Sequence, residues 1–100
     1  MARLDVYPMP GNRPGFVVDV QTQFLDHLAT RAVVPLIQRD RAPPPVKDLN
    51  PVFDVAGGAY VLVTQAIASV PAKELKTPVA SLGNRHDDVT RALDILLIGF

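Results

Sequence analysis

The stretch Phe16–Gln21, with the sequence FVVDVQ, decides the fold because its side chains alternate in character. In an extended chain, successive side chains point to opposite faces. The first, third and fifth side chains of this stretch are apolar and share one face, whereas Val17, Asp19 and Gln21 share the other. We therefore predict a half-buried strand with one face in the core and one polar face.

Further strands are predicted on both sides of this stretch. Arg3–Tyr7 alternates in a similar way, and Ile67–Val70 is predicted to be another short strand, which Pro71 ends. Arg31–Ile37 is rich in β-branched residues and apolar on both faces, but Pro35 has no N–H to donate to a neighbouring strand. We expect an edge position or a bulge there. Together these runs predict a mainly β protein.

Glycine and proline mark the connections between these strands. Pro51–Thr64 contains two strand-like runs around Gly57-Gly58, which predicts a hairpin with the two glycines as its turn. Pro8–Gly15 and Gln38–Asn50 are rich in proline and are predicted to be exposed loops, the second partly polyproline-like. The stretch Glu74–Leu82 is ambiguous between strand and loop.

One segment, at the end of the chain, has the pattern of a helix. Asn84 is a suitable N-cap, Asp87 and Asp88 lie in the first turn, and Gly99 follows the last turn as a stop. The apolar stripe consists of Val89, Ala92, Leu93 and Leu96, widened by Ile95, Leu97 and Ile98. A stripe this broad indicates that the helix covers the sheet on one side and meets a partner on another.

Composition limits the class of protein. The 100 residues predict a single domain, and a formal net charge of zero gives no electrostatic reason to expect binding to nucleic acid or anionic lipid. The absence of cysteine excludes a disulfide framework, a thiolate metal site and a thiol nucleophile. Neither a signal peptide nor a membrane-spanning stretch is apparent, since the longest apolar run, Val55–Val63, is too short. We expect a cytoplasmic protein.

Enzymatic activity is not expected from these residues. Cleavage of RNA would need an acid, a base and a cation that converge on a groove. The candidates are His86 with Arg85 and Asp87, or Arg31 with Asp19 and Glu74. The first set is better explained as a solvated first turn of the helix, and no spacing indicates a metal or cofactor site.

Four segments together resemble one protein family. They are VDVQ (Val18–Gln21), VVPL (Val33–Leu36), ASVP (Ala68–Pro71) and the final helix that closes on apolar-Gly-apolar. Their order and spacing are similar to those of the CcdB family, the toxins of ccd toxin–antitoxin modules, from end to end. The resemblance implies an SH3-like β-barrel variant, an antiparallel sheet with a small additional sheet, and one C-terminal helix.

The same resemblance implies a function. CcdB-like toxins are homodimers that bind the A subunit of DNA gyrase, trap its cleavage complex with DNA and serve plasmid maintenance. A CcdA-like antitoxin neutralises the toxin, which reaches operator DNA only through that antitoxin. The loops Pro8–Gly15 and Gln38–Asn50 suit recognition of a private antitoxin, or are ordinary surface loops.

The resemblance also assigns target-binding residues. The gyrase-binding residues carried over to this chain are Phe24, Leu25, Asp94, Leu97, Ile98, Gly99 and Phe100. Well-known gyrase poisons of the family carry tryptophan at the position of Ile98 and asparagine at that of Asp94. Phe100, an aromatic residue nearby, could fill the same pocket. The alternatives are a CcdB-like dimer that binds antitoxin but has lost or changed its gyrase target, and a ribonuclease toxin of the related barrel family.

Overall fold

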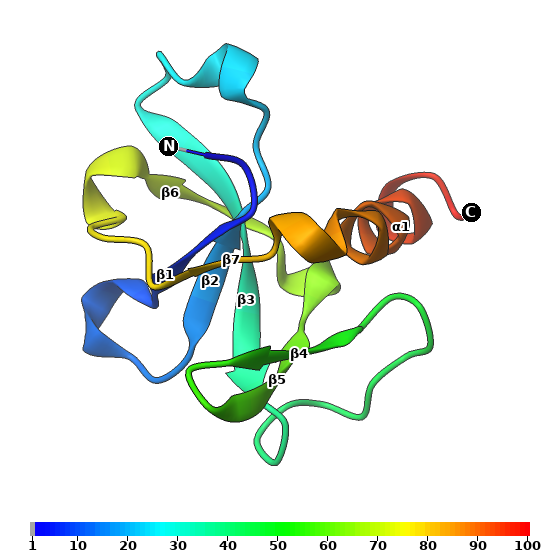
Figure 1. The fold of residues 1–100 in the computed structure, drawn as a ribbon. Helices are drawn as coiled ribbons and strands as arrows, with labels where there is room; N and C mark the ends of the chain where they lie inside the picture. Colours follow the sequence, from blue (N-terminus) through cyan, green and yellow to red (C-terminus); the bar gives the residue numbers. More distant parts are fainter. Residues whose placement is uncertain (1) are drawn as a thin grey trace.

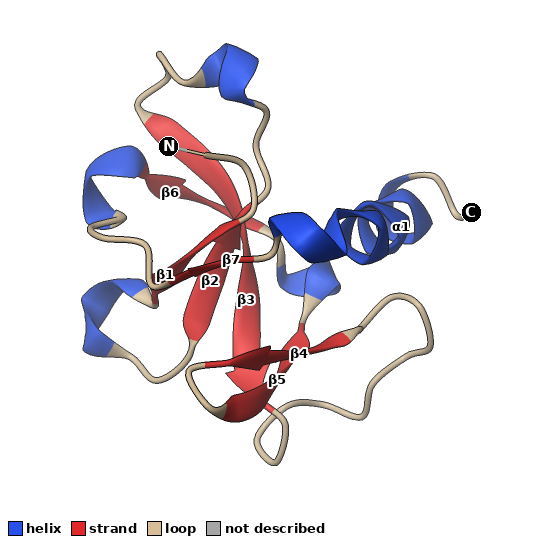
Figure 2. Cartoon of the chain, in the orientation of Figure 1, coloured by secondary structure: helices blue, strands red, loops and turns tan. Residues whose placement is uncertain are grey.

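The computed structural model describes residues 2–100 and consists of one antiparallel sheet with one α-helix at its side (Figures 1 and 2). The strands are β1 (Asp5–Pro8), β2 (Phe16–Asp19), β3 (Thr30–Gln38), β4 (Val52–Val55), β5 (Gly58–Leu62), β6 (Ala68–Pro71) and β7 (Ala80–Ser81), and the helix is α1 (His86–Leu97). The strand order is β4-β5-β3-β2-β1-β7, and β6 pairs with the first half of β3, Thr30–Val33. This nearly closed sheet with a C-terminal helix confirms the predicted small SH3-like barrel.

The prediction of a polar face on β2 is wrong. The strand ends at Asp19, and both Val17 and Asp19 are buried, at 2% and 0% exposure. Val17 packs in a small apolar cluster with Tyr7, Val33 and Leu75 on the side of the sheet away from α1. Asp19 is buried because Arg31 on the neighbouring strand neutralises it. A second layer of packing thus covers the face that the sequence pattern assigned to solvent.

The prediction of an edge position for Pro35 is also wrong, because β3 lies in the middle of the sheet. β3 pairs with β6 over Thr30–Val33 and with β5 over Leu36–Gln38, so that Pro35 falls in the gap between the two partners. Its carbonyl accepts a hydrogen bond from Val63 N at 2.9 Å on that side. In an antiparallel pair, the N–H and C=O of one residue point toward the same neighbouring strand. The N–H that Pro35 lacks would therefore point to the place where β3 changes from β6 to β5, and neither strand needs a hydrogen bond from it there.

The hairpin of β4 and β5 is confirmed, but its turn is one residue earlier than predicted. Val55 pairs with Gly58, which leaves Ala56 and Gly57 as the two turn residues. Both have positive φ, 51° and 81°, as a type I′ turn requires. The second glycine of the pair, Gly58, therefore begins β5.

The helix begins later than predicted. Gly83–Arg85 forms a 3₁₀ turn, so Asn84 does not cap α1, and the residue before the helix, Arg85, makes no side-chain capping bond. The expected end is confirmed, because Gly99 has φ 96° and its N–H donates to the carbonyls of Asp94 and Ile95. The acidic first turn, Asp87 and Asp88, is also present.

The remaining segments follow their predictions with small shifts. β1 begins at Asp5 rather than Arg3 and extends to Pro8, and β6 begins one residue later than expected. The ambiguous segment 74–82 contains the two-residue strand β7. Among residues 2–100, no helix has the length and apolar character that crossing a membrane would require.

The main core lies between the inner face of the sheet and α1. Val89 and Ala92 of α1, both fully buried, pack into an apolar cluster with strand residues such as Val18, Leu36 and Phe53. On the opposite face, burial raises the pKa of Tyr7, and the nearby carboxylates of Asp5 and Asp19 add to the increase. Tyr7 therefore remains a neutral phenol at physiological pH.

Two glycines allow a matched test of this backbone. Gly15 and Gly57 both have positive φ, but a Cβ on Gly15 would lie 2.7 Å from the carbonyl oxygen of Leu36, whereas one on Gly57 would meet nothing within 4 Å. We expect Gly57→Ala to lower the free energy of unfolding by about 1 kcal/mol through backbone strain alone. Gly15→Ala should cost about 2 kcal/mol more, measured by urea unfolding at one protein concentration. Equal losses for the two variants would contradict the close approach at Gly15.

Candidate partner-binding site

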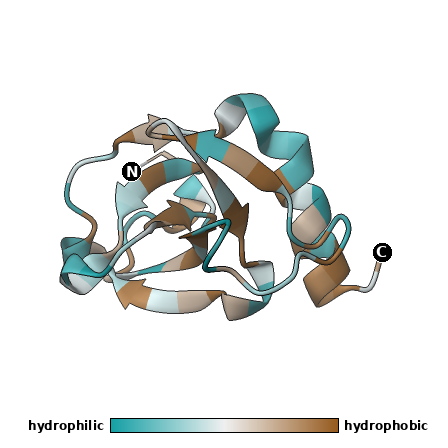
Figure 3. Ribbon diagram, turned by 90° about the horizontal axis from the view of Figure 1, so that it is seen from below, coloured by the Kyte–Doolittle hydropathy of each residue, from teal (hydrophilic) through white to brown (hydrophobic). Residues whose placement is uncertain are grey.

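The end of α1 presents a group of apolar side chains to solvent. Leu97, Ile98 and Phe100 are 70%, 61% and 87% exposed. The N–H of Ile98 donates to the carbonyl of Asp94 at 2.8 Å, and the positive φ of Gly99 then turns the chain away from the helix axis. We call Asp94, Leu97, Ile98, Gly99 and Phe100 the helix-end patch. Figure 3 shows the last turn of the helix in the brown of hydrophobic residues.

The other two residues assigned to target binding lie elsewhere. Phe24 and Leu25 belong to a 3₁₀ turn, Gln23–Leu25, in the loop between β2 and β3, and are 90% and 39% exposed. We call this segment the Phe24 turn. It borders a recess with His86, the first residue of α1, whereas Phe100 lies beside Asp94 near the last. Since twelve helical residues span about 18 Å, the seven predicted residues form two separate surfaces in one chain.

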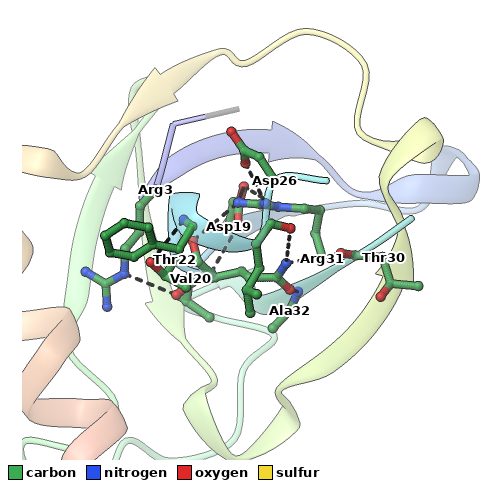
Figure 4. A network of polar contacts seen from close by, with 11 residues as sticks. Arg3, Asp19, Val20, Thr22, Asp26, Thr30, Arg31 and Ala32 are labelled. Carbon is green, nitrogen blue, oxygen red and sulfur yellow. Dashed lines mark hydrogen bonds and ion pairs between the residues drawn. The ribbon is translucent and has the colours of Figure 1, made fainter. Parts of the chain in front are cut away.

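The Phe24 turn is held by a buried ion pair that extends to the surface (Figure 4). Arg31 donates from Nε at 3.0 Å and from Nη2 at 2.8 Å to Oδ2 of Asp19, and both residues are fully buried. Its remaining terminal nitrogen, Nη1, donates to Oδ1 of Asp26 at 2.7 Å. Asp26 directly follows the Phe24 turn and is 46% exposed, so Arg31 links the core to the turn.

A glutamine makes the second attachment. Gln21 accepts a hydrogen bond from the N–H of Ala32 at 3.0 Å and donates to the carbonyls of Leu25 and Thr30 at 3.2 and 3.3 Å. Every residue from 22 to 30 is exposed. Polar contacts rather than apolar packing therefore fix the Phe24 turn, and the sequence analysis missed these roles of Gln21 and Asp26.

On the side of the sheet away from α1, a groove of about 520 Å³ lies between the two proline-rich loops. Met9 and Arg13 come from the first loop, and Arg41 comes from the second. Its floor is apolar and includes Val33 of β3 and Ala68 of β6. These are the loops that the sequence analysis associated with an antitoxin.

The residues considered for RNA cleavage are engaged in other contacts. Arg85 contacts Asp88 at 2.6 Å and stacks over the ring of Phe53 at 4.5 Å, and His86 Nδ1 lies 3.1 Å from Asp87 Oδ1. The guanidinium of Arg31 is enclosed by Asp19 and Asp26, while Glu74, its other proposed partner, is exposed in a 3₁₀ turn after β6.

Comparison with known proteins agrees with this architecture. A solved structure described as "Endoribonuclease in complex with its cognate antitoxin from Mycobacterial species" matches with a TM-score of 0.76 over 97% of this chain and 94% of that one. At 17% sequence identity, this likeness concerns the fold alone. The family model described as "CcdB protein" matches residues 3–99, nearly the whole sequence. The chain therefore belongs to the CcdB family.

Proposed function

We propose that this chain, a toxin of the toxin–antitoxin type by its family, binds the A subunit of DNA gyrase and traps the cleavage complex of the enzyme with DNA. The observation that carries the proposal is the helix-end patch, where three large apolar side chains are more than half exposed at the end of the chain. Contiguous exposed apolar surface is typical of a site that a partner covers.

Phe100 is the strongest single candidate for the anchor of this contact. It is aromatic, 87% exposed and next to the turn at Gly99, so its ring can enter a pocket of a partner without disturbing the core. Aromatic side chains dominate binding energy because they bury a large rigid area at low entropic cost. In this proposal Phe100 replaces the tryptophan that well-known gyrase poisons carry at the position of Ile98.

The active form in this proposal is a cytoplasmic homodimer without enzymatic activity. Pairing would present two helix-end patches to a two-fold symmetric target. The zero net charge is compatible with self-association because it offers little long-range repulsion. The engagement of Arg31, Arg85 and His86 in internal or neighbouring contacts supports a toxin that acts by binding rather than by cleavage.

The antitoxin, in the same proposal, occupies the groove between the two proline-rich loops, and operator DNA is reached only through the antitoxin. An extended peptide could place apolar side chains on the floor of the groove and carboxylates near Arg13 and Arg41. The different positions of this groove and the helix-end patch would allow the two contacts to be separated by mutation.

Binding to gyrase tests the target. We expect the purified protein to bind the dimerisation domain of the gyrase A subunit, and Phe100→Ala to weaken this binding by about a hundredfold, as loss of a dominant aromatic anchor does. Val79→Ala is the control, since Val79 is 52% exposed and lies outside both target-binding surfaces. Calorimetry or surface plasmon resonance measures the dissociation constants.

Three results would favour three different functions. If a folded dimer does not bind gyrase and expression is harmless, the chain has lost or changed its target. RNA loss without a DNA-damage response would instead indicate the ribonuclease alternative. DNA damage that requires residues 98–100 agrees with gyrase poisoning, whereas killing by a chain that lacks these residues contradicts it.

Blocking the groove tests the antitoxin contact. Ala68 of β6 is exposed and lines the groove, and its neighbour Ser69 is exposed but does not line it. We expect Ala68→Arg to abolish protection by the co-expressed antitoxin while toxicity persists, and Ser69→Arg to remain protected, because successive strand residues face opposite sides. Colony counts with the antitoxin induced provide the measurement. Full protection of Ala68→Arg would exclude the groove as the antitoxin site.

A further inference from the structure

A recess of about 530 Å³ separates the Phe24 turn from the start of α1. Arg3 and Leu4 line it from the N-terminal segment, Thr22 and Phe24 from the loop after β2, and His86 from the helix. The recess is open to solvent, and Phe24, one of its lining residues, is 90% exposed. It lies on a different part of the molecule from the groove between the proline-rich loops.

The recess carries positive charge that no acidic group within it neutralises. None of the described residues that line it is an aspartate or a glutamate. Arg3 is half-buried, and its Nε donates to the carbonyl of Val20 at 3.1 Å. Within residues 2–100, the two terminal nitrogens of Arg3 have no hydrogen-bond acceptor and no ion-pair partner. By contrast, Arg31 and Arg85 each contact a carboxylate at less than 3 Å.

The contact with Val20 fixes the direction of the Arg3 guanidinium. Figure 4 shows Arg3 at the edge of the polar network, joined to Val20, with its terminal nitrogens directed away from the other residues drawn. A planar guanidinium held through one N–H loses less freedom when it binds a second group. Its two remaining terminal nitrogens match the two oxygens of a carboxylate. The arrangement is therefore prepared for an anionic group that this chain does not supply.

We infer that the recess receives an acidic side chain of the toxin's protein target, whose carboxylate binds the terminal nitrogens of Arg3. The inference rests on the proposed function, because the occupant is assigned to the gyrase A subunit. Charge complementarity defines the acidic group. Phe24 indicates that the occupant is a protein. Its exposed aromatic ring on the wall of the recess can make apolar contacts with residues that flank an acidic side chain, and a small inorganic anion has no such residues.

The Phe24 turn gives this recess a defined wall. The contacts of Asp26 with Arg31 and of Gln21 with Leu25 hold the end of the turn, and Thr22 Oγ1 accepts from the N–H of Phe24 at its start. The ring of Phe24 and the guanidinium of Arg3 are therefore both held in place before a partner binds. Binding would then cost little conformational entropy at either group. The recess thus extends the target surface beyond the helix-end patch to the opposite end of α1.

The carboxylate site can be tested without the target. Labelled protein is titrated with malonate at constant ionic strength, with chloride as the reference anion, and the Nε–Hε resonance of Arg3 is followed by NMR. We expect a saturable shift with malonate that chloride does not reproduce, together with a shift of the Phe24 amide. The Phe24 response should disappear in Arg3→Gln and persist in Arg39→Gln, which removes an exposed arginine outside the recess. An Arg3 resonance that does not move, or moves equally with chloride, overturns the inference.

Target binding completes the test. For the dimerisation domain of the gyrase A subunit, we expect Arg3→Gln to raise the dissociation constant about tenfold and Arg3→Glu to raise it further, with Arg39→Gln within about twofold of the parent. Thermal unfolding of each variant verifies that the fold is kept. If the parent binds and both Arg3 variants bind equally well, the inference fails and the proposed function stands. If the parent itself does not bind, the proposed function fails, and with it the assignment of the occupant to gyrase.

Discussion

Two opposite charges, on Arg31 and Asp19, are buried side by side between β2 and β3, and the rest of the structure is arranged around them. A buried charge costs several kcal/mol unless it is paired and hydrogen-bonded, so each residue requires the other. Asp19 accepts from Arg31 twice and also from the N–H of Gln21, while the guanidinium reaches outward to Asp26. The pair therefore joins the last residue of β2 to the second residue of β3 and, through Asp26, positions the loop between these strands. Two apolar side chains could fill the same volume, but they would have no group that could bind Asp26 in the exposed loop.

The barrel places three candidate binding surfaces on different parts of the molecule. One surface is the helix-end patch, the second is the Phe24 turn with its cationic recess, and the third is the groove between the proline-rich loops. The first two lie at the end of the helix or on a loop, and the walls of the third are loops, where side chains can change without loss of the core. This separation suits a toxin that must contact both a target and an antitoxin, because the two surfaces can vary independently.

Local patterns predicted the strands and the helix well, and the errors arose where tertiary contacts decide. The alternation in Phe16–Gln21 located β2, but its supposed polar face is buried because Asp19 meets a charged partner twelve residues away. Pro35 indicated an edge strand, but it lies in a central strand at the point where β3 changes from one partner strand to the other. No local sequence pattern reveals such a change of partner. The seven residues predicted to bind the target were named by resemblance. Only the three-dimensional arrangement shows that these residues divide between the two ends of α1. It also shows the recess beside Arg3.

Polar contacts, above all that of Asp26 with Arg31, and not apolar packing, fix the Phe24 turn. Amide hydrogen exchange measures this most directly, since Leu25, Asp26 and Leu28 donate N–H bonds within the loop. In Asp26→Asn, these three amides should exchange about tenfold faster than in the parent, while Val34 in β3 remains protected and the exposed Asp40→Asn control behaves as the parent. Unchanged exchange in the loop of Asp26→Asn would contradict this role of Arg31 and would leave the Gln21 contacts as the ones that hold the turn.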